Sequence, residues 1–138
     1  MRKCNSSITF VSMEKKIIRT DSAPAPIGPY SQAVQFGNIL FISGQIALDP
    51  KTGNLVQDDI KTETGQVMKN LEAILHEAGM DFNNVIKTTI FLMDMGQFAQ
   101  VNEVYGNYFA SNAPARETVQ VAGLPKGVNV EISMMAGK

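Results

Sequence analysis

The chain has 138 residues, of which 44% are hydrophobic, enough to form the core of one domain. Its 12 basic and 13 acidic residues give a net charge of -1, which argues against an electrostatic nucleic-acid-binding protein. No apolar run approaches the roughly 20 residues that span a bilayer, and the single cysteine, Cys4, cannot form a disulfide within the chain. We therefore expect a cytoplasmic protein without nucleic-acid or membrane partners.

The first residues differ in composition from the rest of the chain. Arg2 and Lys3 lie in a stretch that is rich in serine and contains no acidic residue before Glu14. We expect residues 1–14 to form a disordered extension, with a short targeting segment as the alternative. Residues 15–138 are then expected to form one domain.

The first half of this domain predicts short strands followed by a helix. Residues 16–20, 31–36 and 39–43 are rich in β-forming side chains, and Gly37-Asn38 is typical of a two-residue hairpin turn between the last two of these segments. Residues 58–76 follow as a predicted helix. Its apolar side chains recur at helical spacing and form one stripe: Val67, Leu71, Ile74, Leu75 and Ala78.

The second half predicts a further helix between strands. Gly79 is a natural end for the first helix, and residues 85–92 are rich in β-branched side chains. Asp94 is a candidate cap for a second helix, and two final strands are expected at 116–121 and 128–134. This order indicates an α+β fold with about six strands and two helices.

Two helices can cover only one face of such a sheet. Residues 39–42 are apolar without alternation, which suggests a strand that is buried on both faces. In a chain of this length, a neighbouring subunit is the simplest cover for the second face. The sequence therefore predicts a homo-oligomer.

The sequence contains no motif for several common classes of active site. His76 is the single histidine, and no cysteine or second histidine stands at a spacing that would complete a zinc site. The glycine-rich motifs of hydrolases and of nucleotide-binding proteins do not occur. Cys4 lies in the expected extension and is a poor candidate nucleophile. We expect neither a metal nor a cofactor.

Polar residues on the last two predicted strands are the remaining candidates. Arg116, Thr118 and Gln120 alternate along one strand, and Glu131 belongs to the polar face of the other. Such alternation is typical of a solvent-facing side of a sheet. If a subunit covers the polar face, Arg116 and Glu131 would instead be partly desolvated and would have to be paired or bind a ligand. An arginine fork suits a small carboxylate, and a glutamate can hold or deprotonate water.

Four segments in this order resemble the RidA/YjgF family of reactive intermediate deaminases. They cover nearly all of the chain from residue 16 to residue 136. The segments are GPYSQAV at 28–34, FISGQIALDPKTG at 41–53, KTTIFLMDMGQFAQVNEVYGNYF at 87–109 and PARETVQVAGLPKGVNVEI at 114–132.

The resemblance implies a chorismate-mutase-like α+β fold, with a six-stranded, mainly antiparallel sheet and two helices on one face. It also implies a homotrimer with active sites between subunits, and no cofactor. The implied activity is hydrolysis of 2-iminobutanoate and 2-iminopropanoate, with their enamine tautomers, to 2-oxo acids and ammonia. That reaction protects pyridoxal-phosphate enzymes from damage by such intermediates.

The resemblance also assigns roles to individual residues. Arg116 of the PAR motif would hold the substrate carboxylate, and Glu131 of VEI would position the attacking water. The residues implied to line the same cleft are Tyr30, Ser43, Gly44 and Asn102. Each of these has an ordinary structural alternative, such as a packed aromatic ring, a strand end, a tight turn or a polar helix surface.

Two positions depart from the family pattern. Many relatives carry a small residue and then cysteine after the PAR arginine, where this chain has Glu117 and Thr118. The loss of that cysteine argues against an obligatory thiol nucleophile. Because a backbone contact at position 118 would survive the change, Thr118 stays a candidate substrate-binding residue.

Two other functions remain open. One is a non-catalytic trimer that binds small 2-oxo or amino acids in a regulatory role. The other is a translation-inhibiting, ribonuclease-like activity, against which the net charge and the absence of a basic-aromatic run both argue.

Overall fold

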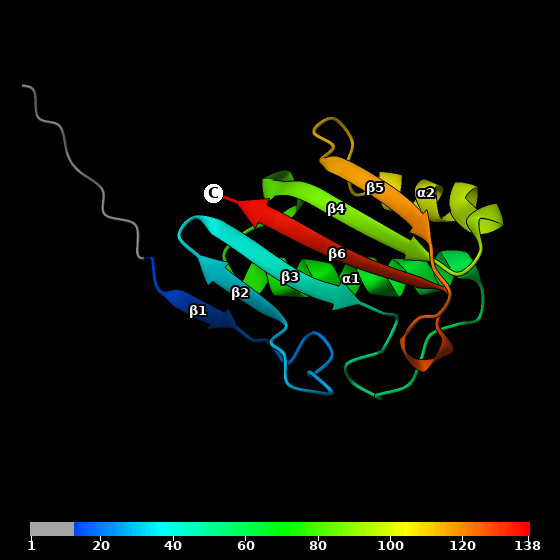
Figure 1. Cartoon of the computed structure of the whole chain (residues 1–138), viewed down its shortest axis with the longest axis horizontal. Helices are drawn as coiled ribbons and strands as arrows, with labels where there is room; N and C mark the ends of the chain where they lie inside the picture. The colour runs from blue at the N-terminus through cyan, green and yellow to red at the C-terminus, as the bar shows by residue number, and fades with distance from the viewer. Residues whose placement is uncertain (1–12) are drawn as a thin grey trace, which may run out of the picture.

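Six strands form one mixed sheet in the computed structural model, which describes residues 13–138 (Figure 1). Only β4 and β5 run parallel, and the other neighbouring strands are antiparallel. The predicted α+β fold with a mainly antiparallel sheet is confirmed. In spatial order, the strands are β1 (Lys15–Ile18), β2 (Ala33–Phe36), β3 (Ile39–Gln45), β6 (Val130–Gly137), β4 (Val85–Leu92) and β5 (Ala115–Gln120).

The expected extension falls almost entirely outside this description. Residues 1–12, with Cys4 among them, lie outside the described residues, so the division at residue 14 stays a prediction. Among residues 13–138, no helix has both the length and the apolar character needed to cross a membrane.

The turn between β2 and β3 forms as its sequence predicts. Phe36 pairs with Ile39, so Gly37 and Asn38 alone connect the strands. Gly37 has a φ of 61°, a left-handed conformation that glycine adopts without steric cost. The prediction of a two-residue hairpin is therefore confirmed.

Helix α1 (Ile60–Glu77) begins and ends at residues that stabilise helix termini. The Asp59 side chain caps the first turn by accepting a 2.8 Å hydrogen bond from the backbone N–H of Thr62. At the other end Gly79 has a φ of 71°, and the N–H of Met80 donates to the carbonyl of Leu75 at 2.9 Å. The predicted stop at Gly79 is confirmed.

Both helices lie on the same side of the sheet, which Figure 1 shows behind the strands. Helix α1 packs on β3 and β6 and against α2 (Phe98–Gly106). The apolar stripe of α1 supplies much of the core, and its fully buried members are Val67, Leu71, Ile74 and Leu75. Asp94 does not cap α2 itself. It caps a short 3₁₀ helix, η2 (Met95–Gln97), which leads directly into α2. Further 3₁₀ turns, η1 (Phe82–Asn84) and η3 (Pro125–Gly127), precede β4 and β6.

No element among residues 13–138 covers the second face of the sheet. Along β3, Leu40 and Ile42 are buried by the helices, whereas Phe41 points to the other face and is 46% exposed. Phe36 and Val119 are exposed as well. Burial of β3 on both faces therefore requires a second molecule, and this part of the expectation stays a prediction.

Candidate active site

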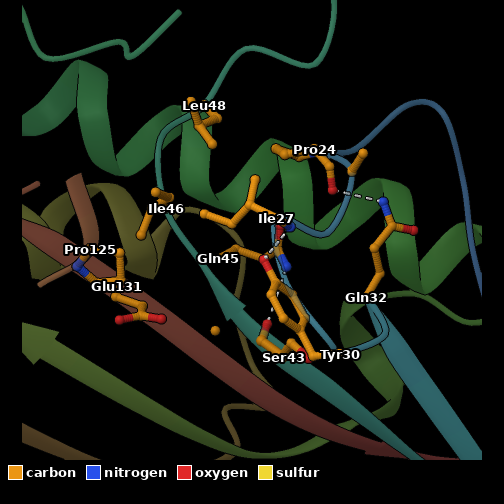
Figure 2. Close-up of a pocket in the computed structure, with 12 residues that line it drawn as sticks. Pro24, Ile27, Tyr30, Gln32, Ser43, Gln45, Ile46, Leu48, Pro125 and Glu131 are labelled. Carbon is orange, nitrogen blue, oxygen red and sulfur yellow. Dashed lines mark hydrogen bonds between the residues drawn. The ribbon is translucent and has the colours of Figure 1, made fainter. Parts of the chain in front are cut away.

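A pocket at the ends of β3 and β6 contains four of the predicted site residues. Tyr30, Ser43, Gly44 and Glu131 line a cavity of about 360 Å³, here called the Glu131 pocket (Figure 2). Its remaining wall is largely apolar and is formed by Pro24, Ala25, Ile27, Gln32, Gln45, Ile46, Leu48 and Pro125. One polar end beside an apolar wall is the usual form of a small-molecule site.

A buried glutamine holds the loop that forms one side of this pocket. Gln32 is 2% exposed, and its amide oxygen accepts a hydrogen bond from the N–H of Thr20 at 2.8 Å. Its amide nitrogen donates to the carbonyls of Thr20, Ala23 and Pro24. Because this one side chain satisfies several backbone groups of an irregular segment, the loop has a defined position beside Tyr30.

The hydroxyl groups of Tyr30 and Ser43 are both engaged with backbone. The Tyr30 hydroxyl accepts a 3.3 Å hydrogen bond from the N–H of Ile27, and the residue as a whole is 48% exposed. Ser43 donates to the carbonyl of Ser31 at 2.6 Å. These bonds orient both side chains, which Figure 2 shows among the residues that line the pocket.

Glu131 supplies the one carboxylate among the described residues that line this pocket. Its side chain is half-buried, and no hydrogen bond or ion pair within residues 13–138 involves its carboxylate. Burial therefore acts unopposed and raises the pKa of Glu131 above its usual value. A carboxylate with no protein partner can hold a water molecule or a substrate proton.

Gly44 makes room for this carboxylate. The pairing of β3 with β6 shifts register between Ile42 and Gln45, so Gly44 lies in an irregular part of the strand directly beside Glu131. A Cβ atom at position 44 would overlap Oε1 of Glu131 and would lie 2.9 Å from its Cδ. The absence of a side chain at this position is therefore required by the observed orientation of Glu131.

A second buried carboxylate holds the chain just before Glu131. Glu63 on α1 is fully buried and accepts hydrogen bonds from the backbone N–H groups of Asn129 and Val130 and from the Asn129 side chain, at 2.8–3.1 Å. These bonds fix the backbone where β6 begins. The sequence contains a signal for this residue, because Glu63 falls four positions before Val67 on the otherwise apolar stripe of α1.

Arg116 lies in a different cavity of about 390 Å³, here called the Arg116 pocket. Its Nη1 donates a 2.7 Å hydrogen bond to Oδ1 of Asn102. The guanidinium carbon lies 5.4 Å from the ring centre of Phe98 and 5.0 Å from that of Tyr105. The pocket is lined by Asn102, Tyr105, Gly106, Phe109, Ala113, Pro114 and Arg116. The sequence does not predict Phe98 or Tyr105 as site residues, although their spacing with Asn102 places all three on one helix face.

The two residues after Arg116 have separate surroundings. Oγ1 of Thr118 is buried and has no hydrogen-bond partner within residues 13–138. Glu117 points to the open face of the sheet, where it pairs with Lys87 at 3.0 Å and accepts a 2.6 Å bond from Thr89. The bond from Thr89 and the neighbouring ammonium of Lys87 lower the pKa of Glu117. This network gives a physical account of the departure at position 117.

Arg116 and Glu131 lie on opposite faces of the sheet. Arg116 pairs with Thr88, which is buried under α2, whereas Glu131 pairs with Phe91. Positions 88 and 91 are three residues apart on β4, so their side chains point in opposite directions. The interpretation that Arg116 and Glu131 share one polar face is wrong. One chain brings Tyr30, Ser43, Gly44 and Glu131 together, and it brings Asn102 and Arg116 together elsewhere.

No group of three or more His, Cys, Asp and Glu side chains within residues 13–138 is arranged to hold a metal ion. Together, the two pockets contain an arginine fork, a free carboxylate, hydroxyl groups and apolar walls.

Comparison with known proteins gives concordant similarities. The family model described as endoribonuclease L-PSP matches residues 20–138. A RutC family protein of Pyrococcus horikoshii is 55% identical, over 90% of this chain and 98% of that protein. The 2-iminobutanoate/2-iminopropanoate deaminase of Mus musculus is 53% identical, over 91% of this chain and 93% of that protein. The crystal structure of Escherichia coli TdcF with bound serine superposes with a TM-score of 0.85 at 41% identity, covering 89% of this chain and 98% of that one.

Proposed function

Because this chain belongs to the endoribonuclease L-PSP family, which includes its RutC and RidA relatives, we propose that it is an imine deaminase. Its substrates are 2-iminobutanoate and 2-iminopropanoate, and its products are the 2-oxo acids and ammonia. The similarity to mouse and human proteins that carry the name of this activity, at 53% and 50% identity, supports the proposal. Acting in the cytoplasm, it would remove intermediates that damage pyridoxal-phosphate enzymes.

The chemistry follows from the two groups that the pockets present. The fork of Arg116 binds the substrate carboxylate and orients the adjacent C=N carbon. Glu131 accepts a proton from a water molecule while the water oxygen forms a bond to that carbon. Glu131 returns this proton to the imine nitrogen, which gives a carbinolamine. The carbinolamine hydroxyl then gives up its proton by way of Glu131 to the amine nitrogen, and the C–N bond breaks as the C=O bond forms, so that ammonia leaves. One water is consumed, and a 2-oxo acid remains.

The free carboxylate of Glu131 is the observation that carries this mechanism. Its pKa is raised by burial, so it is a stronger base than an exposed glutamate. Because no group within residues 13–138 is bound to it, its oxygens are available to water. Tyr30, Ser43 and Gly44 surround the place where that water would react, and Asn102 and Thr118 belong to the carboxylate side of the site.

Because the two pockets of one chain are separate, a complete site requires a second subunit. Arg116 and Glu131 of one chain cannot act on one small substrate, because the sheet lies between them. A homotrimer in which the Arg116 pocket of one subunit faces the Glu131 pocket of the next would complete each site. The exposed apolar residues on the open face of the sheet support such an association.

The deaminase proposal is tested by following the imine itself. Threonine dehydratase and threonine generate 2-iminobutanoate, and semicarbazide traps whatever has not been hydrolysed. The wild-type protein should suppress trapping, and Arg116→Ala should not. Arg19→Ala, a change at an exposed arginine after β1, is the matched control and should behave as wild type. Equal suppression by Arg116→Ala and wild type would refute the role of the arginine.

The shared site is tested by mixing two inactive variants. Arg116→Ala and Glu131→Gln subunits are unfolded together in equal amounts and refolded, so that mixed trimers form. If each site takes Arg116 and Glu131 from different subunits, about a quarter of the sites regain both residues and activity returns. If both residues act within one chain, mixing restores nothing.

The same assays separate the rival functions. A regulatory binder would bind 2-oxobutanoate directly without accelerating imine decay. The serine bound in the TdcF structure shows that a relative can hold an amino acid. A ribonuclease, the activity in the description of the matched family model, would cleave RNA after rigorous repurification.

A further inference from the structure

Arg116 makes contacts with α2 that carboxylate binding by itself does not require. Phe98, Asn102 and Tyr105 occupy successive turns of one face of α2, and the guanidinium of Arg116 lies across all three. Both rings are within the distance of about 6 Å at which a cation and an aromatic face attract. Asn102 binds Nη1, so the hydrogen bond and the two rings together define where the guanidinium lies.

Tyr105 is itself held firmly. It is 5% exposed, and its hydroxyl forms a 2.8 Å hydrogen bond with the hydroxyl of Thr88, which is fully buried. Its ring also packs against Phe109, with 4.8 Å between the ring centres. Thr88 is the strand partner of Arg116, so a closed circuit of contacts joins β4, α2 and β5.

This circuit matters because β5 is an edge strand. A long arginine side chain on an edge strand has many accessible rotamers, and binding a ligand would have to restrict them. Contacts that restrict the rotamers before the ligand arrives remove part of that cost. Burial, the largest effect, raises the pKa of the Tyr105 phenol overall, although its hydroxyl is held by Thr88 and also lies close enough to Arg116 for the guanidinium to lower that pKa.

We propose that Tyr105, together with Phe98, is a positioning residue that preorganises the guanidinium of Arg116 for an incoming carboxylate. The proposal rests on the carboxylate-binding role of Arg116 given above. The ring of Tyr105 is its main contact with Arg116, and the hydroxyl group chiefly holds the ring in place. Affinity should therefore depend on an aromatic side chain at position 105, while stability should depend also on the hydroxyl.

Binding of 2-oxobutanoate by calorimetry tests this division. Tyr105→Leu should weaken binding about three- to thirty-fold, the range expected for loss of one cation–π contact. Tyr105→Phe leaves the Thr88 hydroxyl unpaired and should lower the melting temperature, yet recover affinity to within about threefold of wild type. Tyr108→Leu is the matched control, because its ring packs on Phe82 and not on Arg116. It should lower stability without changing affinity.

A spectroscopic measurement makes the test independent of catalysis. In the wild-type protein, ring currents should move the Arg116 side-chain proton signals upfield, and Tyr105→Leu should reduce that shift while Tyr108→Leu should not. No upfield shift in the wild type, or equal loss of affinity in Tyr105→Leu and Tyr105→Phe, would overturn the proposal. If imine hydrolysis is absent but the ring dependence is present, the deaminase proposal fails and this one stands. If hydrolysis is present and Tyr105→Leu binds as wild type, the reverse holds.

Discussion

Replacing Gly44 by alanine is the smallest change that should disable the Glu131 pocket. The added Cβ would overlap Oε1 of Glu131 and would lie 2.9 Å from Cδ and 3.1 Å from Cγ. The backbone of Gly44 is not in the left-handed region, so alanine brings no conformational strain of its own. The strain is confined to the contact with the glutamate side chain, which must move.

The size of the effect can be estimated from this contact. Non-bonded carbon and oxygen atoms pack at about 3.5 Å, so the carboxylate must retreat by about 1 Å. A displacement of that size at a reacting group can cost about 100-fold in rate. Stability should change little, by about 1 kcal/mol or less, because the end of a flexible side chain can move and alanine lowers the entropy of the unfolded chain.

The assay is semicarbazide trapping of 2-iminobutanoate, run beside thermal unfolding of the same preparation. Gly65→Ala is the matched control, since a Cβ at this position within α1 meets no atom within 4 Å. This control should raise the free energy of unfolding by about 0.5–1 kcal/mol and leave the rate unchanged. Wild-type activity in Gly44→Ala, or a loss of activity that merely follows unfolding, would refute the reasoning.

Three further predictions follow from the same geometry. Arg116→Lys keeps the charge but loses the planar fork, so the rate of imine decay should fall by about tenfold or more. Because burial raises the pKa of Glu131, the rate should fall as the pH drops through a value above the usual 4.3 or so of glutamate, and Glu131→Gln should abolish both activity and this pH-dependent limb. Glu63→Leu leaves the N–H groups at the start of β6 without their acceptor and should cost about 3 kcal/mol in urea unfolding, whereas Glu77→Leu at the exposed end of the same helix should cost less than about 0.5 kcal/mol.

Features whose cause is local could be predicted from the sequence. The turn at Gly37-Asn38 and the helix end at Gly79 depend on residues that adopt a left-handed backbone, and both formed where expected. The apolar stripe of α1 is likewise a property of adjacent turns. The predicted start of the last strand was less accurate, because β6 begins at Val130 and not at 128. The N–H of Val128 donates to Pro125 in the preceding turn, and Glu63, on a helix far away in sequence, accepts from the N–H groups of Asn129 and Val130.

Glu63 shows how a non-local partner limits such predictions. Its position on the apolar stripe of α1 indicates burial, and a buried carboxylate must have donors. The donors are backbone N–H groups 66 and 67 residues further along the chain, and no property of the sequence around Glu63 identifies them. Tyr105 is a similar case. The sequence shows its spacing from Asn102, but its contact with Arg116 depends on where β5 lies in the sheet.

The alternation of polar and apolar residues could not show that Arg116 and Glu131 lie on opposite faces of the sheet. Alternation groups residues by face within one strand, but the faces of two strands are related only through pairing order and register. Here β4 lies between β5 and β6, and its residues 88 and 91 are the partners of Arg116 and Glu131. A shift of either register by one residue would have put both side chains on one face. The observed register separates them, so a reaction that uses both groups must occur between molecules, and the activity should be lost when the assembly dissociates.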